Sequence, residues 1–378
     1  MNERIQQAME LTKDTLLNYK MQGKTVSCSV SGGADSDILI DLCERLVPHY
    51  VNYVFFDTGI EYQATKNHLE FLEKKYNITI HKEKAKIPVP LGNKRYGIPF
   101  LSKQVSEYIH RLQIHNFDWN LLTYEENLQR YPKCKTALRW WCNAAGEKSA
   151  FNINRNVWLK EFLVKNPPTF PISPRCCEGA KKNPNKNYMK THTHSLSIVG
   201  IRQAEQGART FVHKGQFQEE EHYTAFYPIY YFTDADRKIY ENEFDIVHSQ
   251  CYTEYGLKRT GCAGCPFGRE YNFEREVIKM YEPKLHKAIE NMWSEVYEYT
   301  NKYKEFQRVQ NLKYKSKKIC TCGCTEFTGD DVAMNLKYFG RDVNTLLCRN
   351  CFQNKMKMTD EQWDATIEGF KAQGCQLF

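Results

Sequence analysis

The sequence contains no long hydrophobic run. No apolar stretch among its 378 residues approaches the ~18 residues that a membrane-spanning helix needs, which excludes a transmembrane protein. The N-terminal region is polar and amphipathic, and it lacks the apolar centre of a secretory signal. Internal repeats and low-complexity tracts are lacking as well. We therefore expect a cytoplasmic globular protein without a membrane partner.

Length and composition are those of an ordinary globular protein. A chain of 378 residues, at roughly 150 per domain, predicts two or three domains. Apolar residues make up 41% and charged residues 26%, which excludes wholesale disorder. The 53 Lys and Arg exceed the 45 Asp and Glu, giving a net charge of +8. This modest excess is compatible with a nucleic-acid or nucleotide-phosphate partner but does not demonstrate one.

Cysteine, by contrast, is abundant, with 15 residues. Structural disulfides are rare in a reducing cytoplasm, so clustered cysteines indicate metal or redox chemistry. Cys28, Cys43 and Cys251 stand alone and are predicted to be small core residues. Cys134 and Cys142 are eight residues apart, which fits no metal-ligand spacing, and we interpret them as free thiols.

Strand-like and helix-like segments alternate in the first part of the chain. Short β-branched and aromatic runs predict strands over 25–31, 51–57 and 78–83. Helical spacing predicts helices over 35–47 and 63–76. This alternation is typical of a parallel α/β sheet whose strands are buried on both faces.

The pattern changes after the third predicted strand. Residues 84–175 contain four of the six Trp and long segments with helical spacing, which predicts a mostly helical insertion. The segment LSIVGIR (196–202) predicts a strand that returns to the sheet. Residues 302–318, with seven Lys or Arg and one Glu, form a basic segment before the Cys-rich end. The predicted domains are therefore a nucleotide-binding domain over 1–310 and a Cys-rich module over 311–378.

The segment SGGADS (31–36) lies between a predicted strand and a predicted helix. Glycines let the backbone approach an oxyanion, and a helix N-terminus presents free N–H groups and a positive dipole end. Ser31 and Ser36 add hydroxyl donors. The segment lacks the Lys-Ser/Thr ending of a Walker loop and the dinucleotide glycine pattern. It therefore predicts a different phosphate-binding loop; the alternative is a Ser/Gly turn capped by Asp35.

Five segments, in the same order, resemble one family. SGGADS resembles the SGGxDS loop of the ATP pyrophosphatases and of the phosphoadenosine-phosphosulfate (PAPS) reductase family. The later segments resemble the reductase branch in particular: FFDTGIEYQAT (55–65), IVGIRQAEQGART (198–210), YPIYYFTDADRKIYENE (227–243) and RTGCAGCPFG (259–268). The resemblance covers about 25–83 and 170–300. It implies an α/β fold with a parallel sheet of the adenine-nucleotide alpha-hydrolase-like (PP-loop) type.

The resemblance also implies a nucleotide site. The implied ligand is ATP with Mg²⁺, or else adenylyl sulfate (APS) or PAPS. Asp35 and Ser36 would position the phosphates as catalytic residues. Arg202 and Arg209 would hold anionic groups; alternatively, they are a solvated surface pair. The implied nucleotide-binding residues are Ser31, Gly32, Gly33, Asp35, Ser36, Asp57, Gly59, Arg202 and Arg209.

Two cysteine pairs, Cys176-Cys177 and Cys262-x-x-Cys265, stand 85 residues apart. A CxxC turn points two thiolates at one centre, and adjacent cysteines can reach separate irons of a cubane. The arrangement resembles the CC…CxxC ligand set of the iron–sulfur members of the family, the APS reductases and the DNA-phosphorothioation sulfurtransferases. That resemblance implies a [4Fe–4S] cluster on these four cysteines. A structural zinc site and unligated thiols are the alternatives.

The C-terminal module carries two further cysteine knuckles, ICTCGCTEF and LLCRNCF. Four thiolates on such knuckles predict a zinc-ribbon-like module that folds around Zn²⁺. We favour Cys320, Cys322, Cys348 and Cys351 as ligands, with Cys324 as a substitute in the first knuckle. Zinc ribbons often bind nucleic acid or proteins; a purely structural module is the alternative.

Two reactions fit the predicted nucleotide fold. In the first, an acceptor oxygen attacks the α-phosphate of ATP, pyrophosphate leaves, and sulfur then displaces AMP. In the second, a cysteine attacks the sulfur of APS or PAPS, and thiols later release sulfite. The reductases usually end in E-C-G-[LI]-H, whereas this sequence ends in Gly-Cys-Gln-Leu-Phe. Cys375 is therefore the candidate nucleophile of the second reaction, without the usual Glu and His.

The intact loop, the basic segment and the predicted ribbon favour the first reaction. We therefore predict ATP-dependent sulfur transfer to, or modification of, DNA or RNA with the help of a sulfur donor. One alternative is a sulfonucleotide reductase served by a thiol reductant protein. The other is a non-catalytic protein that binds nucleotides and nucleic acid.

Overall fold

The computed structural model describes residues 2–146, 149–205, 215–315, 320–324, 326–340, 343, 345–373, 375 and 377–378. The chain divides into two compact units. The first comprises Met1–Gly97 and Pro174–Met292, and the second comprises Ile98–Ser173 and Trp293–Phe378. The domain boundary expected near residue 310 stays a prediction.

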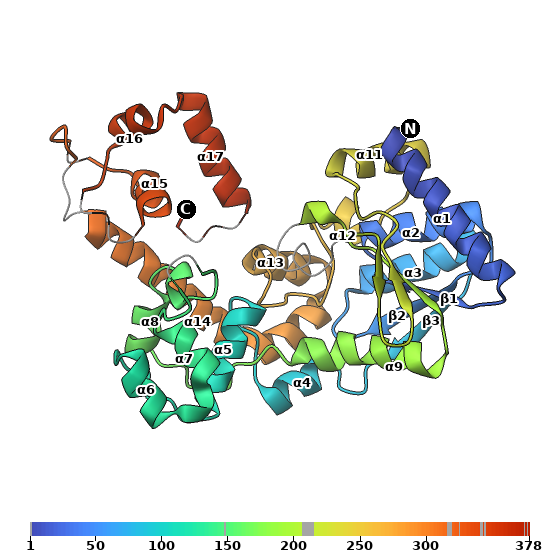
Figure 1. Ribbon diagram of the computed structural model, residues 1–378, viewed down its shortest axis with the longest axis horizontal. Helices are drawn as coiled ribbons and strands as arrows, with labels where there is room; N and C mark the ends of the chain where they lie inside the picture. The colour runs from blue at the N-terminus through green and yellow to red at the C-terminus, as the bar shows by residue number, and fades with distance from the viewer. Residues whose placement is uncertain are drawn as a thin grey trace. The chain divides into compact units, whose positions relative to one another are not determined.

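The first unit contains a six-stranded sheet (Figure 1). Its order is β3-β2-β1-β4-β6-β5, and all neighbours are parallel except β5, which runs antiparallel to β6. The strands are β1 (Val26–Val30), β2 (Asn52–Asp57), β3 (Ile80–Lys84), β4 (Leu196–Val199), β5 (Phe217–Glu219) and β6 (Thr224–Phe226). The predicted parallel α/β class is confirmed. The sequence did not predict β5 and β6, because runs of three residues are too short to show a period.

Helices pack on both faces of this sheet. On one face, Ile5 of α1 and Ile38 of α2 join Cys28 of β1 in the main apolar core. On the other face, Met189 of α9 packs with Val54 of β2. The helices of this unit are α1 (Glu3–Met21), α2 (Ala34–Leu46), α3 (Gln63–Tyr76), α4 (Val89–Tyr96), η3 (Glu178–Lys182), α9 (Asn183–Thr191), η4 (Gln203–Glu205), α11 (Asp234–Glu243), α12 (Gln250–Thr253) and α13 (Tyr271–Tyr281).

The second unit is helical in its described residues. Its elements are α5 (Lys103–Gln113), α6 (Tyr124–Arg130), η1 (Pro132–Cys134), α7 (Lys135–Trp141), η2 (Ile153–Arg155), α8 (Leu159–Lys165), α14 (Pro283–Lys315, most of whose length lies in this unit), α15 (Gly329–Phe339), α16 (Arg349–Met356) and α17 (Asp360–Ala372). Trp140 and Trp141 of α7 are buried and pack with Tyr108 and Trp119. No helix in the described part of the chain is both long and apolar enough to cross a membrane.

The C-terminal residues have their own apolar core. Phe327, Met334, Leu346, Phe352 and Trp363 are all buried in it. The module is therefore a folded helical unit in its described part, with its two cysteine knuckles joined to α15 and α16 rather than to strands.

Candidate functional site

The order of the sheet reverses between β1 and β4. Strands β2 and β3 continue outward on one side of β1, while β4 and β6 continue on the other. Ligands of parallel α/β sheets bind at such a reversal, outside the carboxyl ends of the strands. The predicted phosphate loop follows β1 directly, and Arg202 lies three residues after the end of β4. The structure therefore brings these two predicted site elements to one place.

The phosphate loop depends on its first glycine. Gly32 has a φ of +66°, in the left-handed region that glycine adopts without strain. A Cβ atom there would also lie 2.7 Å from Cγ2 of Thr65. Gly33 follows in an extended conformation and is the N-cap residue of α2. The N–H groups at the start of α2 are thereby presented next to the turn, as anion binding requires.

The Ser36 hydroxyl holds this loop together. It donates to the carbonyl oxygen of Gly33 at 2.7 Å and accepts from the N–H of Gly33 at 3.0 Å. The N–H of Ser31 is a third partner, at 3.3 Å. Ser36 is buried, whereas Ser31 is exposed. Ser36 thus fixes the loop from inside, and its contact with a nucleotide stays a prediction.

Asp35 and Arg202 form an ion pair at the reversal point. Nε of Arg202 lies 2.9 Å from Oδ1 of Asp35, and its Nη1 lies 2.9 Å from Oδ1 of Asp234. Burial raises the pKa of Asp35, and the positive charge of Arg202 acts against this rise. Arg202 itself is buried, so it is not a solvated surface residue. Arg209 lies outside the described residues.

Two hydroxyl groups beside the loop were missed by sequence reasoning. Oη of Tyr252 accepts a hydrogen bond from the N–H of Ala34 at 3.2 Å and lies 3.3 Å from Oγ1 of Thr260. A Cβ atom on Gly33 would lie 3.0 Å from Oγ1 of Thr260 and 3.2 Å from Oη of Tyr252. Thr260 belongs to the segment RTGCAGCPFG (259–268), whose resemblance to the family could have indicated it. No motif in the sequence indicated Tyr252.

A buried carboxylate supports the first turns of α2 and was also missed. Asp37 is completely buried between two histidines: Nε2 of His68 lies 2.9 Å from Oδ1, and Nδ1 of His248 lies 2.7 Å from Oδ2. Nε2 of His248 lies 3.1 Å from Glu241, which pairs in turn with Arg237 at 3.0 Å. Burial lowers the pKa of His248, but the bonds to Asp37 and Glu241 outweigh it and raise the pKa to about 9.

The charged groups around Asp37 are connected to the phosphate loop by one further contact. Nη1 of Arg237 lies 3.9 Å from Oδ1 of Asp35. Charged groups from α2, α3, α11 and the segment before α12 therefore meet beneath the loop.

Asp57 and Gly59 form the turn after β2. Oδ1 of Asp57 accepts from the N–H of Gly59 at 2.8 Å, and Gly59 has a φ of +81°. A Cβ atom on Gly59 would lie 2.9 Å from Cβ of Pro88, so only glycine fits there. Thr58 donates to the buried Glu61 at 2.6 Å. This turn lies at the carboxyl end of β2, next to the loop after β1.

The four cysteines of the predicted cluster gather in the first unit. A hydrogen bond shared with Cys177 and burial raise the pKa of Cys176, and nearby Cys265 and Cys262 raise it further. Burial and the charge of Cys262 raise the pKa of Cys265 to about 12. The thiol of Cys262 lies 3.6 Å from Oγ1 of Thr58, which joins this centre to the turn after β2.

These four thiols are spaced more widely than the ligands of one ion. Among the described residues, one group of at least three His, Cys, Asp or Glu has its ligand atoms within 4.8 Å of one another, and it is the C-terminal one. The Lys181 ammonium is the positive charge at the centre. Burial lowers the pKa of Lys181, but Cys262 and Glu61 outweigh that effect and leave it raised.

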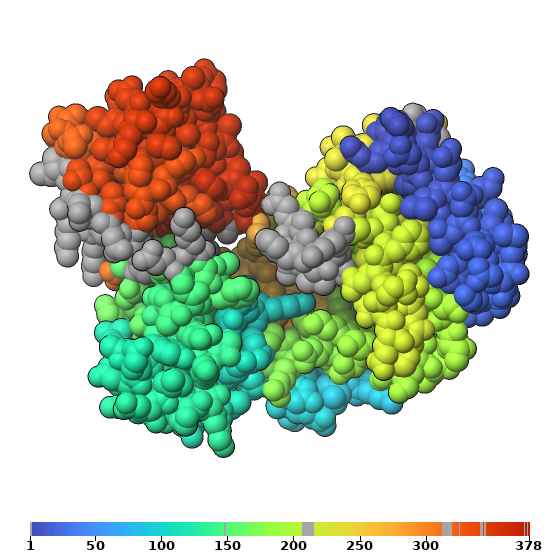
Figure 2. Space-filling view, in the orientation of Figure 1, coloured from blue at the N-terminus to red at the C-terminus, as the bar shows by residue number. Residues whose placement is uncertain are grey.

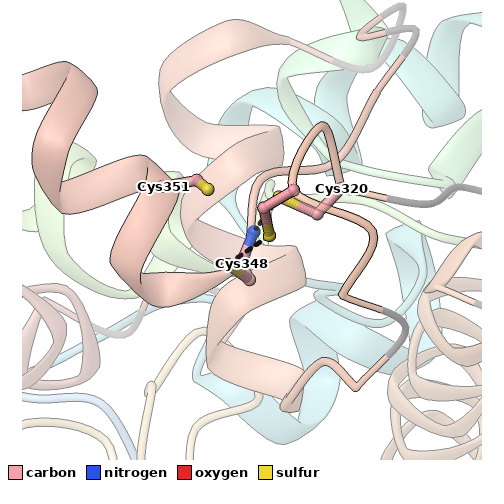
Figure 3. A group of neighbouring side chains, drawn as sticks. Cys320, Cys348 and Cys351 are labelled. Atoms are coloured by element: carbon pink, nitrogen blue, oxygen red, sulfur yellow. Dashed lines mark hydrogen bonds between the residues drawn. The ribbon is translucent and has the colours of Figure 1, made fainter.

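The C-terminal group consists of the four favoured cysteines, Cys320, Cys322, Cys348 and Cys351. Sγ of Cys322 lies 3.7 Å from Sγ of Cys348, and the N–H of Cys348 donates to Sγ of Cys320 at 3.2 Å. Figure 3 shows Cys351 facing Cys320 and Cys348 from α16. Burial opposes ionisation of Cys320, but N–H groups of Cys322 and Cys348 lower its pKa to about 6.

Two other cysteines of the C-terminal region lie apart from this group. Sγ of Cys324 donates to the carbonyl oxygen of Glu326 at 3.4 Å, so this thiol bonds to the neighbouring backbone. Cys375 lies 3.9 Å from Nζ of Lys337. Its predicted role as a nucleophile has no further support from these contacts. Its neighbours Gly374 and Gln376 lie outside the described residues.

Part of the chain matches a known protein family. Residues 25–130 match the phosphoadenosine phosphosulfate reductase domain. The predicted resemblance to the PAPS reductase family is confirmed by this match, which includes the phosphate loop, Asp57 and Gly59. Arg202 and both cysteine centres lie beyond residue 130, and the roles of all the predicted site residues, those inside the match included, stay predictions.

A curated relative gives no activity. An uncharacterized protein of Methanocaldococcus jannaschii is 22% identical over 305 residues, which are 79% of this chain and 55% of that protein. The chain thus spans about half the length of the curated relative it matches.

Solved structures with partial likeness belong to several enzymes. Phosphoadenylyl-sulfate reductase from Candida auris covers 69% of this chain and 96% of its own, with a TM-score of 0.37 and 14% identity. NH3-dependent NAD synthetase from Campylobacter jejuni covers 78% of this chain and 95% of its own, with a TM-score of 0.32 and 12% identity. A U34-tRNA thiolase from Methanococcus maripaludis, solved with its [4Fe–4S] cluster, covers 80% of this chain and 80% of its own, with a TM-score of 0.32 and 12% identity. Scores this low bear on neither substrate nor activity.

Proposed function

We propose that this protein is an enzyme that uses ATP to activate a nucleic acid for sulfur transfer or modification. The observation that carries the proposal is the course of the segment from Tyr252 to Cys265. Tyr252 and Thr260 lie against the phosphate loop, and Cys262 lies against Thr58 after β2. One short piece of chain therefore joins the loop to the thiols at one edge of the sheet. A reaction that uses both a nucleotide and thiol chemistry needs such proximity.

The chain's own residues bind and position the nucleotide. N–H groups of the loop and of the start of α2 bind the polyphosphate oxygens. Arg202, held by Asp35 and Asp234, adds positive charge beside them. Oδ2 of Asp35 has no hydrogen-bond partner in the described part of the chain, and a free carboxylate oxygen suits a Mg²⁺ ion that is also bound by phosphates.

The proposed first step is attack at the α-phosphorus of ATP. An oxygen of the acceptor forms the new bond to phosphorus, and the bond to pyrophosphate breaks. N–H groups at the start of α2 stabilise the charge that develops on the phosphate oxygens once the nucleotide has displaced the Tyr252 hydroxyl from Ala34. Sulfur then displaces AMP from the acceptor.

The four thiols of the first unit fit an iron–sulfur cluster. They are close enough to affect one another's pKa, yet their sulfur atoms are too far apart to coordinate one metal ion together. This spacing is expected when each thiolate binds a different iron. The Lys181 ammonium offsets part of their negative charge. When bound, a [4Fe–4S] cluster supplies a site for sulfur or for electrons. For the tighter C-terminal group we propose a structural Zn²⁺ site instead.

The test is anaerobic incubation of the full chain with ATP, APS or PAPS, each in separate reactions. With nucleic acid and sulfide present, we expect AMP and pyrophosphate from ATP and no sulfite from the other two. Cys262→Ser should lose iron and sulfur transfer, whereas the matched Cys375→Ser should keep both. Cys375-dependent sulfite would establish the reductase alternative. A chain that binds nucleotide and nucleic acid but forms no product from either would be the non-catalytic protein, and a chain that binds no nucleotide at millimolar concentration would overturn the proposal.

A further inference from the structure

Two short segments of the first unit are strongly basic. The whole chain has 53 Lys and Arg against 45 Asp and Glu. Residues 84–95 and 175–190 together contain nine of these cations and one of these carboxylates, Glu178. These two segments therefore carry a net charge of +8, and residues 302–318 of the other unit carry +6.

The two segments lie against each other in the first unit. A Cβ atom on Gly92 of α4 would lie 3.2 Å from Cα of Cys176. A Cβ atom on Gly179 would lie 3.1 Å from Cβ of Ile87. Figure 1 shows α4 beside α9, and Figure 2 shows their cyan and yellow-green surfaces adjoining. We call this patch, residues 84–95 and 175–190, the basic surface.

Eight cations of the basic surface are exposed: Lys84, Lys86, Lys94, Arg95, Arg175, Lys182, Lys186 and Lys190. The ninth, Lys181, lies among the thiols of the first-unit centre. Lys182, Lys186 and Lys190 recur every four residues, so they follow one another along one side of a helical segment. The helix that holds the last two, α9, contains no acidic residue.

An aromatic ring lies among the arginines of this surface. The guanidinium carbons of Arg95 and Arg175 each lie 5.9 Å from the ring centre of Tyr96. Tyr96 is half-buried, so part of its ring faces solvent. Stacking of unpaired bases on such rings, beside cations that bind the backbone, is how proteins hold single-stranded nucleic acid.

The basic surface also surrounds part of the proposed thiol centre. Cys176 and Cys177 stand between Arg175 and the π-helical turn η3, which ends in Lys181 and Lys182. The side chain of Cys177 is partly exposed beside this surface, whereas that of Cys176 is buried. An acidic protein surface would meet the lysines equally well, but it would leave Tyr96 without a role.

We propose that the basic surface binds the phosphate backbone of a single-stranded segment of nucleic acid and holds it beside Cys177. This inference rests on the proposed function, because it identifies where that reaction's acceptor binds. The three lysines of the stripe contact successive phosphates, and Tyr96 stacks on a base next to them.

The test compares two variants of the full chain that lose the same charge. One is Lys182→Gln/Lys186→Gln/Lys190→Gln, and its control is Lys13→Gln/Lys74→Gln/Lys238→Gln, three exposed lysines on α1, α3 and α11. Binding of a fluorescent single-stranded RNA 20-mer, the same DNA and its duplex is measured over a range of salt, without nucleotide. The stripe variant should lower the slope of log affinity against log salt by about 2 on single strands, since each phosphate contact contributes about 0.7.

The remaining arms decide between partners. Tyr96→Ala should weaken single-strand binding roughly tenfold, as expected for one lost stacking contact, and should leave duplex binding unchanged. RNA and DNA compared at equal length identify which acceptor is preferred. Equal losses in the two triple variants would overturn the proposal, because the attraction would then be diffuse. Equal binding of poly-glutamate, or no binding of any strand, would overturn it as well. Nucleotide turnover is measured separately, so failure of the proposed chemistry leaves this result unaffected.

Discussion

The phenol oxygen of Tyr252 accepts a hydrogen bond from the N–H of Ala34, 3.2 Å away. That N–H belongs to the first residue of α2 and is one of the groups that an anion on the phosphate loop would use. In the proposed function, this hydroxyl competes with a phosphate oxygen of the nucleotide for that N–H group.

Tyr252→Phe should therefore tighten ATP binding. The substitution keeps the ring and removes the group that competes for Ala34. A neutral hydrogen bond is worth about 0.5–1.5 kcal/mol, so we expect the dissociation constant to fall by about 2- to 10-fold in calorimetric titration. Tyr255→Phe is the matched control, because Tyr255 bonds to Glu282 rather than to the loop. Weaker binding in Tyr252→Phe would mean that the phenol donates to the nucleotide.

Asp35→Asn should abolish formation of AMP and pyrophosphate, whereas Asp234→Asn should only reduce it. Both substitutions remove a carboxylate from Arg202, but only Asp35 belongs to the loop. Because Arg202 is buried, Asp35→Asn should also cost about 1–3 kcal/mol of unfolding free energy, measured with urea. Equal turnover in the two variants would remove Asp35 from the catalytic residues.

His248 should make stability depend on pH on the alkaline side. Its pKa is raised from the ordinary 6.5 to about 9, so the protonated form stabilises the folded state. This contribution, at most roughly 3 kcal/mol, is complete below about pH 6 and is lost as the pH rises through 9. Urea unfolding between pH 6 and 10 measures the loss, and His248→Gln should flatten it. A wild-type stability that stays level over this range would refute the role of the Asp37–His248 pair.

The zinc content of single Cys→Ser variants should show which thiols of the first knuckle bind the proposed C-terminal metal. Cys320→Ser and Cys322→Ser should lose zinc and the amide protection of α15 and α16, because metal binding is coupled to folding in such modules. Cys324→Ser should keep both, since its thiol bonds to Glu326. Zinc content and hydrogen exchange of the full chain are the measurements. Loss of zinc in Cys324→Ser would exchange the roles of Cys324 and Cys322.

Local patterns were sufficient to predict the strand–loop–helix of the nucleotide site. Gly32, Asp35 and Ser36 are neighbours in the sequence, and their spacing carries the motif. The partners of these residues could not be predicted in the same way. His68 and His248 lie 180 residues apart and meet only because both pack on Asp37. A single histidine or tyrosine has no period, so its partner is decided by tertiary packing alone.

The same limit applies to the cysteine centres. The CxxC spacing of the second C-terminal knuckle predicted that Cys348 and Cys351 lie in one group of thiols, and the structure places them so. The first knuckle left Cys324 as a substitute for one ligand, and only the backbone conformation, with Gly323 at a φ of +83°, turns that thiol away. Strands β5 and β6 escaped prediction because three residues give no alternation to count.

The order of segments in the first unit has a consequence for biosynthesis. Its two pieces, Met1–Gly97 and Pro174–Met292, are separated in the chain by residues of the second unit. The phosphate loop and β1 to β3 therefore leave the ribosome long before β4, and one edge of β1 stays unpaired until residue 199 has been made. All four cysteines of the first-unit centre come from the later piece. The four thiols can therefore meet only after synthesis has passed Cys265.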